Sequence, residues 1–150
     1  MRKSFIYALL LTAALLLPKS DVELGKMKPV ETVSLRNRDG LVIVETDTED
    51  VGMGITLEEA LENLRKTTAG RIYLDTAAFL LLDPEMTDQA EMLRGNLKGS
   101  VRLCECSGEV DVKEAGEYLR CHSPKVELKD WKKGMRLQIL ETENGRMKLS

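Results

Sequence analysis

The sequence predicts an α+β domain: a mixed β-sheet with parallel neighbours in its middle, hairpins at both ends, and about three packed helices. Capped helical stretches at residues 56–69 and 112–121 alternate with short runs of strand-forming residues. A helix between successive strands favours parallel pairing of those strands. Turn signals at residues 37–40 and 143–145 predict the two hairpins. The helices must cover at least one sheet face to bury their apolar stripes.

The first half of the domain contains its clearest helix. Residues 30–35 and 41–46 are expected to form the first hairpin, and residues 47–54 an acidic, glycine-punctuated loop. Thr56 is the expected N-cap of the helix that follows, and Glu59 completes a capping box. One apolar stripe runs along that helix at positions Leu57, Ala60, Leu61 and Leu64.

A strand buried on both faces is predicted next. It begins at residues 71–75 and runs through small residues into residues 79–82, where the composition is entirely apolar. We expect the helix 56–69 to dock on this strand. Asp83-Pro84 is a helix-start signal. Inward-facing residues then recur at helical spacing up to the stop at Gly99, namely Met86, Ala90, Leu93 and Leu97.

The last third continues the alternation. Residues 101–106 have the pattern of a half-buried strand, and Asp111 with Glu114 forms a second capping box for the helix 112–121. Residues 136–141 and 146–149 are predicted to pair as the closing hairpin.

Residues 1–20 have the pattern of a targeting segment, followed by one domain over residues 21–150. Arg2 and Lys3 precede an apolar stretch at residues 5–17, which is shorter than the roughly 20 residues of a membrane-spanning helix. We expect export, with the segment either cleaved as a signal peptide or retained as an N-terminal anchor that contacts the membrane. The structural alternative is a buried N-terminal helix.

Composition limits the function. The formal net charge is −3, and no basic stripe is interleaved with aromatic residues, so we expect no nucleic-acid partner. Aromatic residues make up only 4% of the chain, which predicts an aliphatic core.

The segment 21–106 resembles the N-terminal domain of the Ger(x)C spore germination family. The likeness lies in Val22-Glu23-Leu24, the first hairpin, and above all Gly54-x-Thr56-x-x-Glu59-Ala60-x-x-x-Leu64. The chain departs from the family where it has Asp75-Thr76 in place of a Gly-His pair, and it lacks the lipidated cysteine that the family has directly after the signal segment. The resemblance implies an extracytoplasmic, non-catalytic module of a membrane-associated assembly in a spore-forming bacterium.

Cys104, Cys106, Cys121 and His122 are the candidate metal or redox residues. Three thiolates and an imidazole would suit zinc, and strand alternation places Cys104 and Cys106 on one face. We favour two buried thiols and one partly exposed thiol over a metal site. A disulfide from Cys121 to Cys104 or Cys106 is the third reading, since export exposes the chain to oxidation.

Four further features have both a functional and a structural interpretation. We expect His122 to be a solvated residue at a helix end rather than a catalytic base. Gly52-x-Gly54 is interpreted as a flexible loop entering the helix rather than an anion cradle. The acidic residues of the loop 47–54 could hold Ca²⁺, although they lack an EF-hand pattern. Trp131 is expected to cover an edge of the core rather than to anchor a membrane or partner.

The sequence therefore predicts a non-enzymatic, exported binding module of the cell envelope, with no catalytic residues, cofactor or metal. The expected partner is another envelope or membrane protein, and the candidate contact surfaces are the sheet edges and the acidic loop 47–54. The alternative is a small redox or metal-binding protein that uses the cysteine set.

Overall fold

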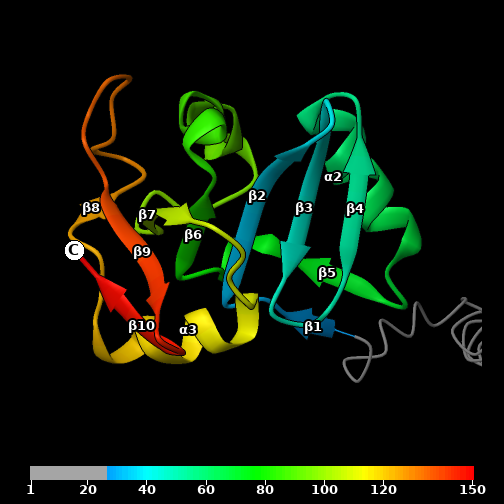
Figure 1. Cartoon of the computed structure of the whole chain (residues 1–150). Coiled ribbons are helices and arrows are strands. Elements are labelled where there is room, and N and C mark those ends of the chain that lie inside the picture. Colours follow the sequence, from blue (N-terminus) through cyan, green and yellow to red (C-terminus); the bar gives the residue numbers. More distant parts are fainter. Residues whose placement is uncertain (1–26) are drawn as a thin grey trace, which may run out of the picture.

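The computed structural model describes residues 27–150, and the predicted targeting segment at residues 1–20 lies outside them. The described chain has an α+β fold built on an eight-stranded sheet (Figure 1). Seven strands follow one another in the order β10-β9-β7-β6-β2-β3-β4, and β8 pairs with β7 beside that path. The strands are β2 (Thr32–Arg38), β3 (Leu41–Thr46), β4 (Val51–Gly54), β6 (Phe79–Leu82), β7 (Arg102–Ser107), β8 (Val126–Glu127), β9 (Gln138–Glu143) and β10 (Arg146–Leu149).

The predicted sheet pattern is confirmed. The middle strands β2, β6, β7 and β9 are parallel neighbours, whereas β2-β3-β4 and β9-β10 are antiparallel. Both predicted hairpins turn on pairs of residues with positive φ, Asp39-Gly40 (52° and 80°) and Asn144-Gly145 (52° and 74°). Two positive φ angles in a two-residue loop give the twist that matches antiparallel strands.

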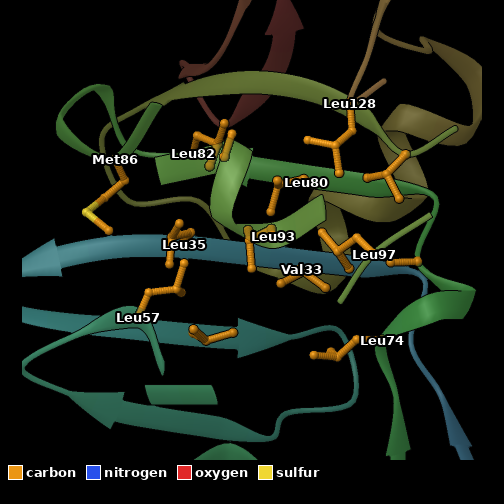
Figure 2. Close-up of a cluster of buried hydrophobic side chains, with 14 of the residues drawn as sticks. Val33, Leu35, Leu57, Leu74, Leu80, Leu82, Met86, Leu93, Leu97 and Leu128 are labelled. Atoms are coloured by element: carbon orange, nitrogen blue, oxygen red, sulfur yellow. The ribbon is translucent and has the colours of Figure 1, made fainter. Parts of the chain in front are cut away.

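Helices cover both faces of the sheet. On one face, α2 (Leu57–Thr67) and the 3₁₀ helix η3 (Pro84–Gly95) enclose the larger apolar core with the inward residues of β2, β3 and β6. Figure 2 shows this core, where side chains of β2 and β6 point toward Leu57, Met86 and Leu93. On the other face, α3 (Val112–Cys121) encloses a smaller core with Phe79, Leu81 and the β7 cysteines.

Local capping places both α-helices as the sequence predicts. The Thr56 side chain accepts a hydrogen bond from the Glu59 amide at 3.2 Å, and the Glu59 carboxylate accepts one from the Ile55 amide at 2.9 Å. Asp111 accepts a hydrogen bond from the Glu114 amide at 2.8 Å. All four predicted stripe residues of α2 are buried, as the amphipathic spacing requires.

The predicted docking of α2 is wrong. The helix packs mainly on β4 and β3 rather than on β6 at residues 79–82, although α2 and β6 contribute to the same core. The reason is the strand β4 (Val51–Gly54), which lies within the predicted loop 47–54. With β4 added at the sheet end, the connection from β4 into α2 is short, and the helix folds back directly onto its own neighbouring strand.

The continuous strand expected from residue 71 to residue 82 is also wrong. The chain forms β5 (Arg71–Tyr73), a 3₁₀ turn η2 (Leu74–Thr76) and then β6. β5 pairs in parallel with β1 (Met27–Pro29) in a separate two-stranded sheet, so a strand precedes the predicted first hairpin. The Thr76 hydroxyl holds this break, since it exchanges hydrogen bonds with the backbone of Val30 at 2.8 and 2.9 Å.

Candidate functional site

The most exposed apolar surface on a regular element lies on β3 and β4. Residues Val42 and Val44 point into the core beneath α2, so the alternate residues of β3 point to the opposite face. The register pairs Ile43 with Met53 and Val42 with Gly54, which places Leu41 opposite Ile55. We call this double row the open strip; it consists of Leu41, Ile43, Val51, Met53 and Ile55.

The open strip is exposed because no helix covers its outermost side chains. α2 lies behind β3 and β4 in Figure 1, and α3 packs mainly on β2, with fewer contacts to β3 and β6. The side chains of Leu41, Met53 and Ile55 are 42%, 52% and 73% exposed. They are three of the six exposed large hydrophobic residues that the described part of the chain contains, gathered on one small area. Such clustering is typical of an interaction surface.

Gly52 and Gly54 lie on the face of β4 that α2 covers, opposite the open strip. A Cβ on Gly52 would lie 2.2 Å from the Ala60 carbonyl oxygen, and one on Gly54 would lie 2.5 Å from the Ala60 amide nitrogen. The two glycines therefore let the helix backbone pack directly against the strand. The sequence interpretation of Gly52-x-Gly54 as a flexible loop is wrong, and their alternation with Val51 and Met53 is the signal that could have identified the strand.

The outer edge of β4 is closed by side chains of α2. The Asn63 side-chain oxygen accepts a hydrogen bond from the Met53 amide at 3.1 Å. The Thr67 hydroxyl donates to the Asn63 carbonyl at 2.9 Å and lies 3.3 Å from the Val51 carbonyl oxygen. The contacts to Met53 and Val51 occupy backbone groups that an exposed edge strand would offer to another strand. A partner can therefore use the apolar face of β3 and β4 more easily than this sheet edge.

Paired charges separate the open strip from α3. Arg36 lies 3.7 Å from the Glu45 carboxylate and donates hydrogen bonds to the Ser34 hydroxyl at 3.1 Å and to the Val110 carbonyl. Arg38 forms an ion pair with Glu109 at the same border. An apolar centre beside a polar border is the usual composition of a protein–protein contact surface.

The structure does not bring the predicted metal and redox residues together. Cys104 and Cys106 share one face of β7, as alternation predicts, and both are buried under α3. Cys121 is exposed at the end of α3, and His122 follows it. Residues 27–150 contain no group of three or more His, Cys, Asp or Glu side chains placed to hold a metal ion.

The predicted alternative of a disulfide is wrong, since Cys104, Cys106 and Cys121 are all free thiols. The Cys104 thiol is held in its neutral form. A hydrogen bond with Cys106 and burial both raise its pKa far above the ordinary value. A neutral buried thiol is a poor nucleophile and a poor metal ligand.

The His122 side chain contacts Tyr118 of α3. Its ring stacks on Tyr118 with centroids 4.2 Å apart, and its Nδ1 lies 3.2 Å from the Tyr118 carbonyl oxygen. Trp131, expected at an edge of the core, is 1% exposed and belongs to the larger core, which leaves no exposed ring for a membrane or a partner.

The acidic loop is tied into the fold rather than open for Ca²⁺. The Asp47 carboxylate accepts hydrogen bonds from the Glu31 amide at 3.2 Å, and Asp50 forms an ion pair with Lys28 at 3.3 Å. Thr48 also donates to Asp50 at 2.7 Å. These bonds hold β1 and the start of β2 against the turn at residues 47–50, so the acidic side chains stabilise the fold.

Comparisons with known protein families, with curated proteins and with solved structures gave no match. Within residues 27–150, no helix combines the length and the apolar character needed to cross a membrane.

Proposed function

We propose that this chain is an exported, non-enzymatic binding module, and that the open strip is the surface on which another envelope protein docks. The observation that carries the proposal is the exposure of Leu41, Met53 and Ile55 side by side on an uncovered sheet face. Removing such side chains from water on binding contributes about 25 cal/mol for each Å² of apolar surface buried. The open strip would therefore bind favourably to an apolar surface on a partner, because both surfaces leave water.

The location and the biological setting in this proposal come from the sequence. The basic and apolar pattern of residues 1–20 supports export, and the resemblance to the Ger(x)C N-terminal domain supports a role in sporulation or germination. The absence of a catalytic constellation in the sequence supports a binding role. We propose that the module acts on the outer side of the membrane of a spore-forming bacterium.

Export is tested by fusing a reporter that is active only outside the cytoplasm to Ser150, and by following it through sporulation. Reporter activity outside the cytoplasm is expected, because the targeting pattern precedes the folded domain. Activity confined to the cytoplasm would overturn the export proposal without affecting the surface argument.

The docking surface is tested with a matched pair of substitutions. Met53 and Met92 are 52% and 50% exposed, but only Met53 belongs to the open strip. We expect Met53→Glu to reproduce the germination or sporulation defect of a gene deletion, and Met92→Glu to behave as wild type, with both variants equally abundant. A deletion without a phenotype would remove the germination link, whereas a functional Met53→Glu variant would remove the open strip.

A further inference from the structure

A second surface lies beside β5, near the C-terminal end of α2. It is a hollow of about 600 Å³ between the end of α2, β5 and the end of η3. Successive residues of β5 contribute to its wall, together with Gly95, the last residue of η3, and Asn96, its C-cap. The lining consists of Arg65, Gly70, Arg71, Ile72, Tyr73, Leu74, Asp75, Gly95 and Asn96.

The hollow follows the edge of β5. Arg71 and Ile72 point to opposite faces of the strand, yet both line the hollow. β5 pairs with β1 along one side, in a sheet of two strands. Along its other side, no strand of the described residues pairs with β5, although the Tyr73 carbonyl oxygen accepts a hydrogen bond from the Thr76 hydroxyl at 2.7 Å. That side therefore offers donors and acceptors to an added strand.

The charge of the hollow is positive, although the whole chain is acidic. Neither Arg65 nor Arg71 has a carboxylate within ion-pair distance in the described part of the chain. Arg65 donates to the Asn96 side-chain oxygen at 2.7 Å, and the Arg71 guanidinium lies 5.4 Å from the Tyr73 ring centroid. Asp75 is the one carboxylate in the lining, so the hollow keeps an excess of one positive charge.

We propose that this hollow binds an extended, acidic segment of a partner protein, which adds as a strand to the free edge of β5. The backbone of the segment would pair with residues 71–73, and its carboxylates would reach Arg65 and Arg71. Both guanidiniums are already oriented by neutral partners, Asn96 and the Tyr73 ring, which lowers the ordering cost of binding a carboxylate. The proposal is independent of the open strip, because it rests on a different surface.

The chemistry of arginine suits Arg65 and Arg71 to binding a partner's carboxylates. A guanidinium offers a planar fork that can bind both oxygens of a carboxylate, and charged hydrogen bonds of this kind are about twice as strong as neutral ones. The opposite edge of the molecule provides the contrast, since Arg38 is already paired with Glu109 in the hollow at the carboxyl ends of β2 and β7. Arg38 therefore has a carboxylate partner within the chain, whereas Arg65 and Arg71 have none among the described residues.

The test uses the full chain in lipid nanodiscs and a capped heptapeptide library in which one position at a time is fixed. Binding is followed by fluorescence anisotropy, and the binding site is located by amide chemical shifts. We expect mixtures with a fixed Asp or Glu to bind at least about tenfold more tightly than those with a fixed Lys. We also expect shifts at residues 71–73, and weaker binding as salt increases.

Paired variants separate the site from the overall charge. Arg65→Gln with Arg71→Gln should abolish the acidic preference. Lys113→Gln with Lys148→Gln removes the same charge from exposed positions away from the hollow and should preserve it. Lack of an acidic preference, or shifts that spare β5, would overturn the proposal. If peptides bound only after Asp21→Lys and Glu23→Lys substitutions, the hollow would belong to acidic residues of the chain itself. That result would also overturn the proposal.

Discussion

Gly52→Ala should destabilise the domain, because α2 lies directly on β4. The added Cβ would lie 2.2 Å from the Ala60 carbonyl oxygen and 2.5 and 2.6 Å from the Leu64 Cβ and amide nitrogen. Ordinary contacts between such atoms are about 3.5–4.0 Å, so the helix must retreat by roughly 1 Å. Two of the three contacted atoms are backbone atoms, which cannot rotate away.

The magnitude follows from that displacement. A gap of this size costs the atoms on both sides about a quarter to a half of their dispersion energy. Overpacking of this kind costs about 1–3 kcal/mol, and we expect the upper half of that range because the whole inner face of α2 moves. With a urea m value of about 2 kcal/mol/M, the midpoint should fall by roughly 1 M or more.

Urea unfolding followed by circular dichroism measures this midpoint, and Gly95→Ala is the matched control. A Cβ on Gly95 has nothing within 4 Å, and its φ is not positive, so alanine should be neutral or slightly stabilising there. If Gly52→Ala unfolded at the same urea concentration as wild type, residues 51–54 would be the flexible loop of the sequence interpretation, and the packing argument would be refuted.

Three further predictions concern caps, thiols and pH. Thr56→Ala should lower the free energy of unfolding by about 1 kcal/mol, because the Glu59 amide loses its cap, and thermal unfolding would show it. A thiol reagent should modify Cys121 quickly in the folded protein, and all three cysteines only after unfolding; fast reaction of a second thiol would contradict the burial of the β7 pair. The hydrogen bond from the Arg120 guanidinium lowers the pKa of the Glu31 carboxylate below its ordinary value of 4.5. The stabilisation from this pair is therefore present above pH 4.5 and is lost as the pH falls through the folded-state pKa of Glu31. Glu31→Gln should therefore be less stable than wild type at pH 7, by under about 1 kcal/mol for a pair at the surface, and the difference should vanish in acid; a constant difference would refute the assignment.

Local signals predicted most of the fold. The capping residues Thr56 and Asp111 mark both α-helices, and Asp39-Gly40 marks a hairpin turn, because each of these residues satisfies a backbone requirement next to it in the chain. The parallel middle of the sheet followed from the alternation of helices and strands. Alternation also placed Cys104 and Cys106 correctly on one face.

The errors arose where distant segments decide the structure. β4 is two glycines and two apolar residues, a composition that disfavours a strand until α2 packs on its glycine face and closes its edge with Asn63 and Thr67. β5 has only three residues, and it is a strand because β1 lies beside it. Such partners cannot be read from a local window.

The open strip was missed for the same reason. Met53 was predicted to lie in the loop 47–54, and the common face of Met53 and Ile55 with Leu41 exists only in the register of β3 with β4. The exposed face at the end of a sheet depends on which strands the helices cover, and the packing of α3 mainly on β2 is a tertiary property. The sequence leads to the proposal of a binding module, but it does not reveal the strand register that forms the open strip.

Site-specific photo-crosslinking in sporulating cells tests the central claim most directly. A photoreactive amino acid replaces Met53 on the open strip or, in the control, Met92 on η3, and adducts are identified by mass spectrometry. We expect a discrete adduct with one envelope protein from position 53, abolished by Ile55→Asp, and none from position 92. Equal crosslinking from both positions, or no adduct from position 53, would contradict the assignment of the open strip as the docking surface.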